Sequence, residues 1–559
     1  MILQPILNLV SICSQKGVNN AVLSPGSRCA PITLAFVRHP KIHSRTISDE
    51  RSAAFIALGM AQQLEKPVVL VCTSGSAAYN YAPAIAEAFF QQIPLIVITA
   101  DRPPEWIDQW DGQTIRQEGI YGQHVKGSFT FPDDYNHDDK VWHANRIANE
   151  AINLAQQFPA GPVHINIPLR EPFYPEDGEV FSFDTKVKQI EAIFSESMIS
   201  SEVKEKLKSK LSGFNKILIV PGQQRPNEKI QKTLDRIASL DKAVVVTDTI
   251  SNLQSEESVN FHDHFVGNKL FQEDLKPDLI ISFGKSIISK SLKLFLRNSD
   301  AEHWHIQHGG YTPDTYQSLT NTISCQALSF LNFLDENITA NQFYSALWKQ
   351  LDQKVKNSLP ALLSDAEFGE YKAIATCLKV IPDHSKLHLA NSMAIRYVNL
   401  LGIRKQELIC NRGTSGIDGS NSTAVGCTFT TKDPVTLITG DLAFFYDRNA
   451  FWHNYTMPNL RIILLNNHAG GIFRLIDGPA KQPELEEFFE TKQNLTALNL
   501  CKDFGFEYHS VSGESDLASV LEKFYHKSLT PKVIEIKTES IRNADILKQI
   551  KQKINERID

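Results

Sequence analysis

Leu437-Ile438-Thr439-Gly440-Asp441 is the stretch that decides the fold, together with Ile462-Ile463-Leu464-Leu465-Asn466-Asn467 in the next apolar run. Each is a continuous apolar segment of strand length that ends in polar residues, which is typical of a strand buried on both faces of a parallel sheet. Asp441 and Asn467 are 26 positions apart, which leaves room for one helix and one strand. Both residues should therefore lie at the carboxyl edge of one α/β sheet, where ligands bind in such folds.

Oxygen ligands gather at this predicted edge. The Asp441 carboxylate, the Asn467 side-chain carbonyl and a backbone carbonyl are donors that a hard ion such as Mg²⁺ prefers, and phosphate oxygens would complete the set. Small residues at Gly440 and 469–471 would let the backbone approach a phosphate group. Asp, Asn and Gly also dominate ordinary turns. Their position after two consecutive buried strands favours the ligand site.

The same alternation of strands and helices extends in both directions from this stretch. Strands are predicted at 20–24, 43–48, 67–73, 94–100 and 163–168, at 216–220, 243–246, 279–282 and 303–306, and at 407–410, 435–438, 461–465 and 533–536, with helices such as 52–64 and 77–92 between them. We therefore predict an α/β fold of three tandem domains with mainly parallel sheets, at 1–175, 189–340 and 355–559. The polar and aromatic stretch 172–188 is interpreted as a linker.

Composition excludes several classes of function. The 559 residues are 42% hydrophobic and 21% charged, with a net charge of −6 and no long block of Lys and Arg, so a nucleic-acid partner is not expected. The start of the chain lacks the pattern of a secretory signal, and no apolar run approaches the roughly 20 residues that span a bilayer. Eight cysteines form no C-x-x-C pair. We expect a cytoplasmic protein without membrane insertion.

A second motif supplies an independent carboxylate. Glu50 follows a predicted strand and opens a helix with small residues at Ala53, Ala57, Gly59 and Ala61. This tract resembles the E-x-x-A-x-x-x-A-x-G-x-A pattern in the pyrimidine-binding domain of thiamine diphosphate decarboxylases and carboligases. The Gly-Asp and Asn-Asn pair likewise resembles the diphosphate-binding motif of that family, although Leu442 stands where a Gly is commoner.

The resemblance implies thiamine diphosphate and Mg²⁺ (or Mn²⁺) as cofactors, with a thiamine diphosphate-binding fold. Residues 1–175 would be the pyrimidine-binding domain, 189–340 a central domain and 355–559 the diphosphate-binding domain. Glu50 would act catalytically, because a carboxyl group that shares a proton with the aminopyrimidine ring favours the imino form that activates the thiazolium. The alternative for Glu50 is an exposed side chain that complements a helix dipole.

Four arginines bear on the choice of substrate. Arg28, Arg102, Arg396 and Arg412 lie at or near predicted strand ends or on a helix. Guanidinium groups that face one pocket would favour substrates with several carboxylates, which Arg binds in a bidentate manner. The alternative for each arginine taken singly is a solvated surface position.

Longer tracts resemble one family within the thiamine enzymes. Residues 25–28, 49–51, 73–77, 99–105, 412–419 and 471–473 are similar, in order and spacing, to the 2-succinyl-5-enolpyruvyl-6-hydroxy-3-cyclohexene-1-carboxylate synthases of menaquinone biosynthesis. The resemblance spans nearly the whole chain. It implies a transferase-type carboligase that decarboxylates 2-oxoglutarate and adds the product to isochorismate.

The resemblance also implies a set of site residues. Substrate contacts would come from Ser27, Arg28, Arg102, Gln113, Lys290, Ser392, Arg396 and Arg412, and cofactor contacts from Glu50, Thr73, Gly75, Ile417, Gly440, Asp441, Asn467, Ala469, Ile472 and Phe473. Gly112, Ser291 and Ala469 depart from the residues expected at their positions. The family's active sites lie between subunits, so a homodimer or a dimer of dimers is expected.

Alternatives from other classes remain. Another thiamine enzyme, such as an acetolactate synthase or a simple 2-oxoacid decarboxylase, would not need four arginines or the 412–419 tract. A cofactor-binding but inactive regulatory subunit would not need Glu50, Asp441 and Asn467 all to be present. A nicotinamide oxidoreductase is disfavoured because no G-x-G-x-x-G follows a first strand.

Overall fold

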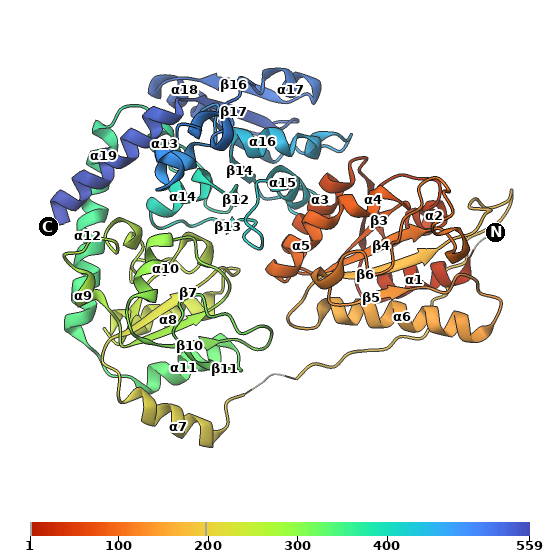
Figure 1. Cartoon of the computed structure of the whole chain (residues 1–559), viewed down its shortest axis with the longest axis horizontal. Coiled ribbons are helices and arrows are strands. Elements are labelled where there is room, and N and C mark those ends of the chain that lie inside the picture. Colours follow the sequence, from red (N-terminus) through yellow and green to blue (C-terminus); the bar gives the residue numbers. More distant parts are fainter. Residues whose placement is uncertain (1–2, 196–197, 559) are drawn as a thin grey trace.

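Three α/β units make up the chain in the computed structural model, which describes residues 3–195 and 198–558. Figure 1 shows the first unit separated from the other two by colour and position, with the third unit above the middle one. All strand pairings among the described residues are parallel. The α/β class with mainly parallel sheets is thus confirmed.

The first unit is a six-stranded sheet in the order β2-β1-β3-β4-β6-β5. Its elements are α1 (Gln4–Gln15), β1 (Asn20–Leu23), α2 (Ala30–Arg38), β2 (His43–Thr46), α3 (Glu50–Leu64), β3 (Val68–Cys72), α4 (Ser76–Asn80), α5 (Ala82–Gln91), β4 (Leu95–Asp101), η1 (Pro104–Trp106), η2 (Gly122–His124), β5 (Ser128–Thr130), α6 (Asp138–Gln156) and β6 (Val163–Pro168). Strands β3, β4 and β6 are buried along their whole length, because helices cover both faces of the sheet.

The middle unit is a five-stranded sheet in the order β11-β10-β9-β7-β8. It contains α7 (Ser201–Leu211), β7 (Ile217–Pro221), α8 (Glu228–Ser239), β8 (Val244–Val245), η3 (Thr249–Ser251), η4 (His262–His264), α9 (Gln272–Leu275), β9 (Leu279–Phe283), α10 (Lys290–Arg297), β10 (Glu302–Ile306), β11 (Leu319–Ile323) and α11 (Ala327–Asn337). The long helix α12 (Gln342–Asp365) then leads to the third unit.

The third unit repeats the strand order of the first, as β13-β12-β14-β15-β17-β16. Its elements are α13 (Glu370–Cys377), β12 (Lys386–Leu389), α14 (Met393–Leu400), β13 (Glu407–Ile409), α15 (Ser420–Thr428), β14 (Val435–Gly440), α16 (Asp441–Tyr446), η5 (Arg448–Phe451), β15 (Leu460–Asn466), η6 (Gly471–Leu475), η7 (Pro479–Lys481), η8 (Leu485–Phe489), α17 (Leu498–Asp503), β16 (Glu507–Val511), α18 (Glu514–Phe524), β17 (Lys532–Lys537) and α19 (Ser540–Ile558). In both sheets the chain order reverses beside the first strand, and ligands bind at such switch points.

Four strands were missed by the sequence analysis: β5, β11, β12 and β16. Three of them are edge strands, and β11 and β16 are only partly buried, so they lack the continuous apolar run that marks a central strand. The predicted helix 77–92 is in fact two helices, α4 and α5, that meet at Tyr81. Pro83 in the first turn of α5 has no N–H to extend the helix before it.

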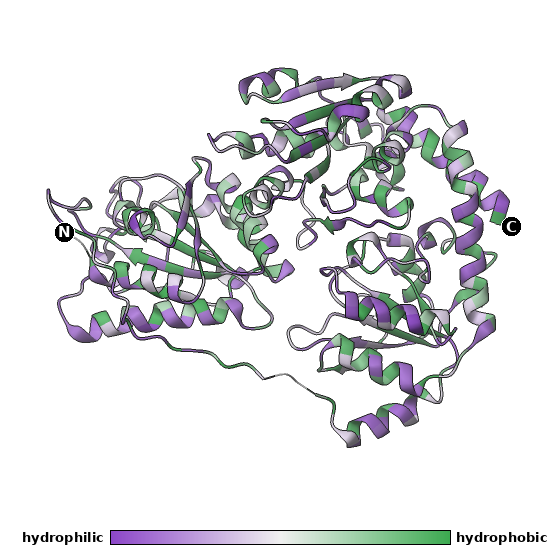
Figure 2. Ribbon diagram, turned by 180° about the vertical axis from the view of Figure 1, so that it is seen from behind, coloured by the Kyte–Doolittle hydropathy of each residue, from purple (hydrophilic) through white to green (hydrophobic). Residues whose placement is uncertain are grey.

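Close packing joins the first and third units. Helices α3 and α15 lie directly against each other, and a Cβ on Gly59 would collide with the carbonyl oxygen of Thr423. A Cβ on Gly426 would collide in the same way with the carbonyl oxygen of Ile56. Figure 2 shows that apolar residues colour much of the central strands. Close contact between two backbones therefore explains Gly59 of α3 and Gly426 of α15.

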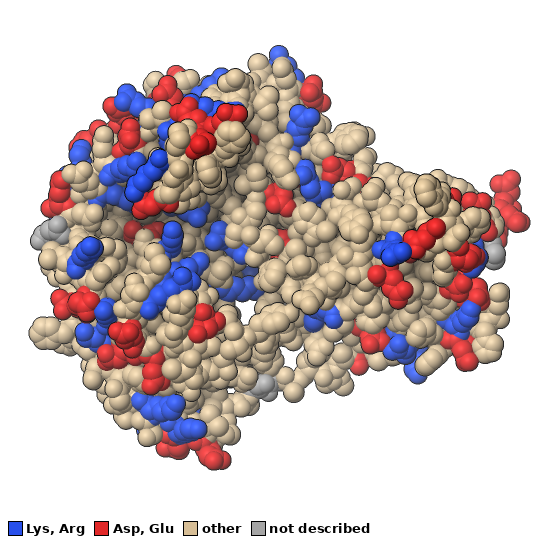
Figure 3. Space-filling model, in the orientation of Figure 1, with Lys and Arg blue, Asp and Glu red and all other residues tan. Residues whose placement is uncertain are grey.

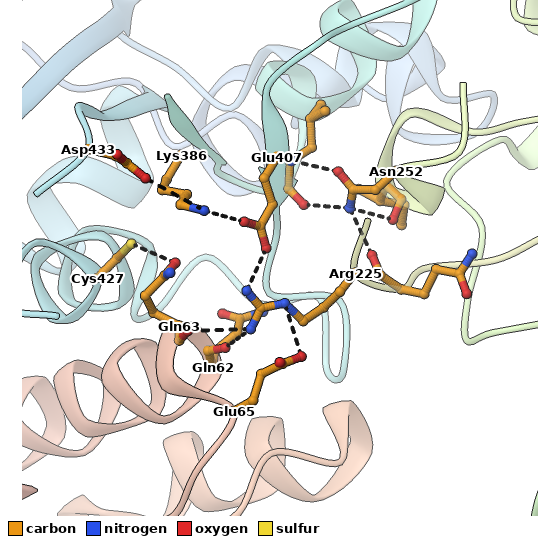
Figure 4. A network of polar contacts seen from close by, with 12 residues as sticks. Gln62, Gln63, Glu65, Arg225, Asn252, Lys386, Glu407, Cys427 and Asp433 are labelled. Atoms are coloured by element: carbon orange, nitrogen blue, oxygen red, sulfur yellow. Dashed lines mark hydrogen bonds and ion pairs between the residues drawn. The ribbon is translucent and has the colours of Figure 1, made fainter. Parts of the chain in front are cut away.

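One arginine links all three units. Arg225 of the middle unit lies between Glu65 of the first unit, at 3.3 Å, and Glu407 of the third, at 3.0 Å. Its Nη1 also donates to the carbonyl oxygen of Gln62 over 2.6 Å. Lys386 approaches the far side of the Glu407 carboxylate to 2.6 Å, as Figure 4 shows.

The stretch interpreted as a linker has no helix or strand between 172 and 188, yet it is not a free tether. Phe173, Phe181 and Phe183 pack against the core of the first unit, and Val187 is buried there. No helix among the described residues is long and apolar enough to cross a membrane. The domain limits 1–175, 189–340 and 355–559 stay proposals.

Candidate active site

A cavity of about 500 Å³ lies at the carboxyl edge of the third sheet. Every residue that lines it lies between 370 and 491. Asn391 and Ser392 follow β12, while Gly440 and Asp441 close β14 and begin α16. Because β12 and β14 are neighbours at the point where the strand order reverses, this is where an α/β sheet places its ligand.

The predicted metal ligands meet on one wall of the cavity. Asp441 is almost fully buried, and its carboxylate accepts hydrogen bonds from Gln493 Nε2 over 2.8 Å and from the Leu442 N–H over 2.8 Å. Asn467 accepts from the Ala469 N–H over 3.0 Å through its side-chain oxygen. Burial raises the pKa of Asp441 to about 6. These groups form a concentrated set of oxygen donors beside the cavity.

Glu370 holds the other end of the Asn467 side chain. The amide Nδ2 donates to Glu370 Oε1 over 2.7 Å, and Glu370 is only 2% exposed. Burial raises the pKa of Glu370 to about 7, and the nearby charge of Asp441 raises it as well. The amide can donate only through its nitrogen, so this bond fixes which side of Asn467 presents its oxygen.

These residues fit a diphosphate held through a divalent cation. A Cβ on Gly440 would meet nothing within 4 Å, so the glycine leaves open space in the cavity where a side chain would otherwise project. The donor set of carboxylate, amide oxygen and main-chain carbonyl suits a hard cation. The described residues hold no cluster of three or more His, Cys, Asp or Glu that could bind a metal.

Two arginines face the same cavity. Arg396 on α14 donates through Nη1 to the Ser392 carbonyl oxygen over 2.6 Å, and Arg412 donates through Nη1 to Asn391 Oδ1 over 2.9 Å. Burial lowers the pKa of Arg396, and the charge of Arg412 lowers it further. The Arg412 Nε is buried and has no hydrogen-bond partner among the described residues. A ligand carboxylate in the cavity would compensate these charges.

Three residues at or beside the cavity have a strained backbone. Ser392, Ser415 and His468 all adopt positive φ, at 73°, 62° and 59°, a conformation that non-glycine residues adopt uncommonly. Ser392 and Ser415 line the cavity, together with Ile417 from the same loop as Ser415. Ile417 is 38% exposed. Strain of this kind is common where a binding site requires a particular backbone position.

An ion pair with a buried carboxylate anchors the segment that carries Ile472 and Phe473. Both residues belong to η6 and line the cavity. Arg474, in the same short helix, approaches the fully buried Glu490 to 2.6 Å, and the Ser540 hydroxyl also donates to the Glu490 carboxylate. The pair ties the pocket-lining helix to the start of α19.

The other predicted residues gather at the carboxyl edge of the first sheet. Ser27 and Arg28 follow β1, Thr73 follows β3, and Arg102 follows β4. Arg28 donates to the Leu169 carbonyl oxygen over 2.7 Å, and the charge of Arg102 is among the causes that lower its pKa, after burial. The Thr73 hydroxyl is buried without a hydrogen-bond partner among the described residues.

Gly75 and Gln113 lie beside this group. A Cβ on Gly75, whose φ is 88°, would come within 3.2 Å of the Gln113 backbone. Arg102 pairs with Asp111 at 2.8 Å and donates to the Gly112 carbonyl oxygen over 2.7 Å. The departure at Gly112 therefore leaves a main-chain contact for Arg102 in place.

Glu50 is the first residue of α3, and its side chain accepts a hydrogen bond from Asn80 Nδ2 over 3.4 Å. Asp49 caps the helix by accepting from the Ser52 N–H, and it also accepts from Asn449 over 2.8 Å. Glu50 is not among the residues that line the cavity of the third unit. One chain thus carries the predicted site as two separate groups.

Lys290 is the one predicted substrate residue that neither group includes. It is exposed at the start of α10 in the middle unit. Lys293, one turn later, lies nearer the arginines: burial lowers the pKa of Lys293, and the charges of Arg412 and Arg396 lower it further. The sequence analysis missed Lys293, and it also missed Glu370, Arg474, Glu490 and Gln493, because their partners lie far away in the sequence.

Comparison with known proteins agrees with this geometry. Models of thiamine pyrophosphate enzymes match the chain in three successive parts: the N-terminal TPP binding domain at residues 8–120, the middle domain at 197–389 and the C-terminal TPP binding domain at 391–536. The fold and the site together define a thiamine diphosphate enzyme.

Relatives named 2-succinyl-5-enolpyruvyl-6-hydroxy-3-cyclohexene-1-carboxylate synthase narrow the assignment. Those of Cytophaga hutchinsonii, Christiangramia forsetii and Porphyromonas gingivalis are 46%, 38% and 36% identical to the chain, over 99%, 97% and 97% of its length and 99%, 97% and 95% of theirs. The chain belongs to the 2-succinyl-5-enolpyruvyl-6-hydroxy-3-cyclohexene-1-carboxylate synthase family, as its sequence tracts predicted.

Proposed function

We propose that the protein decarboxylates 2-oxoglutarate and adds the resulting succinyl semialdehyde unit to isochorismate, with thiamine diphosphate and Mg²⁺ (or Mn²⁺) as cofactors. The product would be 2-succinyl-5-enolpyruvyl-6-hydroxy-3-cyclohexene-1-carboxylate, in menaquinone biosynthesis. One observation carries the proposal: a single cavity has hard oxygen donors at Asp441 and Asn467 on one wall and the guanidinium groups of Arg396 and Arg412 on another. All eight cysteines are free and buried, which fits a reducing compartment such as the cytoplasm.

Residues of the third unit would hold the diphosphate end of the cofactor. Asp441, Asn467 and the Ala469 carbonyl would bind the metal, with Gly440 leaving room for the phosphates. Ile417 would support the bend of the cofactor, and Ile472 and Phe473 would form the apolar wall of the pocket. When bound, thiamine diphosphate supplies a carbon nucleophile and an electron sink for the decarboxylation of 2-oxoacids.

Residues of the first unit would hold the pyrimidine end. Glu50 would share a proton with the ring nitrogen, while Thr73 and Gly75 would contact the ring from the neighbouring strand. The unpaired Thr73 hydroxyl supports this role, because buried hydroxyl groups normally have a partner. Ser27, Arg28, Arg102 and Gln113, from the same edge, would complete the substrate site.

Both substrates carry two carboxylates, and the arginines match them. Arg396, Arg412 and Ser392 would bind one carboxylated substrate in the cavity, with Lys290 contributing from the middle unit. Arg28 and Arg102 would bind from the opposite side. Guanidinium groups recognise carboxylates through paired hydrogen bonds, which also fixes the orientation of the substrate.

The two groups of residues would meet across a subunit boundary. The cavity is lined from residues 370–491 alone, whereas Glu50 lies with the first sheet. A second copy that places its first sheet over this cavity would complete the site. We therefore propose a homodimer or a dimer of dimers with active sites at the interface.

The test supplies purified protein with thiamine diphosphate, Mg²⁺, 2-oxoglutarate and isochorismate, and measures CO₂ together with the coupled product. Coupled release of CO₂ and product is expected. Arg412→Ala should reduce it, and Arg146→Ala, which changes a half-buried arginine on α6, should leave it unchanged. Equal turnover of pyruvate without any need for isochorismate would refute the assignment.

A further inference from the structure

Glu87 is a buried carboxylate that reaches from the first unit into the third. It lies on α5 and is the only charged residue in the apolar segment Ala82–Gln91. Its exposed fraction is 1%. A buried carboxylate needs compensating partners, and these come from residues more than three hundred positions later in the sequence.

The partners of Glu87 belong to the loop that carries Arg412 and Ile417. Glu87 Oε1 accepts from the Gly413 N–H over 2.7 Å. Glu87 Oε2 accepts from the Thr414 N–H and from the Thr414 hydroxyl, each over 2.6 Å. Three hydrogen bonds therefore fix the two residues that directly follow Arg412.

A fourth bond completes the carboxylate. Gln91, one turn along α5, donates through Nε2 to Glu87 Oε1 over 2.5 Å. A carboxylate has about four acceptor sites, and here each oxygen accepts two donors. Every acceptor position of the Glu87 carboxylate is therefore used. A glutamine at this position would place its NH₂ group, a donor, against groups that are themselves donors.

The close approach of the loop to Glu87 also explains why residue 413 is a glycine. A Cβ on Gly413 would lie 2.6 Å from the carbonyl oxygen of Glu87 and 3.1 Å from its carboxyl group. The loop can approach α5 this closely only with glycine at this position. In the Arg412-Gly413 pair of the sequence motif, the arginine thus faces the cavity and the glycine packs against α5.

Asn391 holds the loop from its opposite side. Its Nδ2 donates to the carbonyl oxygens of Asn411 and Gly416, each over 2.7 Å, and its Oδ1 accepts from Arg412. Asn391 belongs to the third unit, so only Glu87 joins the loop to the first unit through these bonds. The loop is therefore clamped between two units of the same chain.

We propose that Glu87 is a positioning residue for substrate binding: it fixes the 412–417 loop so that Arg412 and Ile417 face the cavity. This inference rests on the proposed function for the identity of the substrate. Glu87 does not line the cavity, so it acts through the loop backbone. The loop's geometry, and with it the carboxylate site of Arg412, depends on a side chain from the pyrimidine-binding unit.

The test compares Glu87→Gln with the wild-type protein. The variant is nearly isosteric but replaces an acceptor oxygen with a donor. Hydrogen exchange of the amides at 413–414 should accelerate, and the KM for 2-oxoglutarate should rise about tenfold or more, since misplacing a substrate-binding group by about 1 Å can cost up to 100-fold. Binding of thiamine diphosphate with Mg²⁺, followed by fluorescence without turnover, should weaken by a smaller factor than the KM rises, because Asp441 and Asn467 stay in place and only Ile417 moves with the loop.

Asp447→Asn is the matched control. Asp447 is also fully buried, and it accepts from the N–H and the hydroxyl of Ser422 over 2.7 Å each, within the third unit. It should lower the melting temperature without the selective rise in KM. If Glu87→Gln fails to fold, Thr414→Val, which removes only the hydroxyl bond, should still accelerate loop exchange and raise KM.

Two outcomes would overturn the proposal. One is unchanged exchange at 413–414 in Glu87→Gln, or in Thr414→Val if the first variant does not fold. The other is a KM increase of the same size in Asp447→Asn. If the wild-type protein does not turn over 2-oxoglutarate at all, the proposed function fails, while the exchange measurement still decides the role of Glu87.

Discussion

Asn467 and Glu370 are joined by a hydrogen bond of 2.7 Å, in which the amide nitrogen of Asn467 donates to the buried carboxylate. The bond joins a loop after β15 to the first residue of α13, ninety-seven positions earlier in the chain. The amide oxygen therefore keeps a fixed direction at the edge of the cavity. Where a residue binds a metal, the role proposed for Asn467, a partner hydrogen-bonded to it in this way commonly tunes the affinity for the metal.

Glu370→Ala should weaken divalent-metal binding by about tenfold or more, in line with the loss of other such partners. Glu370→Gln keeps an acceptor oxygen for Asn467 and should therefore weaken divalent-metal binding less than Glu370→Ala does. Titration of Mn²⁺ in the presence of thiamine diphosphate, followed by electron paramagnetic resonance, measures the affinity directly. Equal affinities in wild type and Glu370→Ala would show that Asn467 does not depend on this bond.

Glu50→Gln should keep the fold and bind the cofactor but lose most turnover. The amide cannot share a proton with the ring as a carboxyl group does, and proton-transfer groups commonly contribute about 10²-fold or more. Steady-state turnover and cofactor binding are measured on the same preparation. Glu65→Gln, at the exposed end of the same helix, serves as the control. A near-normal rate for Glu50→Gln would remove this residue from catalysis.

Arg474→Met should loosen η6 and destabilise the third unit. The change leaves Glu490, which is fully buried, without its ionic partner, and breaking a buried pair commonly costs about 3–5 kcal/mol. The double variant Arg474→Met/Glu490→Met removes both charges and should recover much of the loss. Urea denaturation measures the free energy of unfolding. A double variant as unstable as the sum of both single variants would contradict this account.

Gly59→Ala should destabilise the contact between α3 and α15 by about 1–3 kcal/mol or more, because the added methyl group collides with the Thr423 carbonyl oxygen. Gly112→Ala is the control, since a Cβ there meets nothing within 4 Å. Melting temperatures of the two variants are compared. Similar values would mean that the helices separate easily and that their close approach is not needed.

His388→Leu should reduce the sensitivity of the protein to acid. His388 is buried in β12, and burial lowers its pKa to about 3. As pH falls below about 6.5, the unfolded state binds a proton that the folded state refuses, so the wild type loses about 1.4 kcal/mol of unfolding free energy per pH unit from this group. The loss continues towards pH 3.

Denaturant curves between pH 7 and pH 5 measure this effect. The wild-type protein should lose stability more steeply than His388→Leu, and the difference in slope should approach one proton. Parallel curves for the two proteins would show that His388 becomes protonated in the folded state.

The surface shows why the arginines were difficult to place from sequence. Figure 3 shows Lys and Arg side chains around the hollow where the units meet, among many others elsewhere on the surface. Arg396 and Arg412 lie sixteen positions apart yet line one cavity. Lys290, which the tracts implied, is exposed, whereas burial and the charges of Arg412 and Arg396 lower the pKa of Lys293, one turn later in α10.

The sequence by itself determined most of the strands, the α/β class and the family. Buried parallel strands leave long apolar runs, and residues such as Gly440, Asp441 and Asn467 follow those runs directly, so local order in the chain already carries the signal. The sequence motifs also included Gly59 and Gly413, but the sequence did not show why glycine is needed at these positions.

Only the tertiary structure decided what surrounds those motifs. Glu370 and Glu87 each bind a loop that is distant in sequence, and no local pattern records such a partner. The two groups of site residues lie at the edges of two separate sheets with the same strand order. The order of strands along the chain specifies each sheet edge. The relative position of the two edges is set by the packing of α3 on α15 and of α5 on the 412–417 loop. These contacts join surfaces that form only after folding, so the sequence does not reveal them.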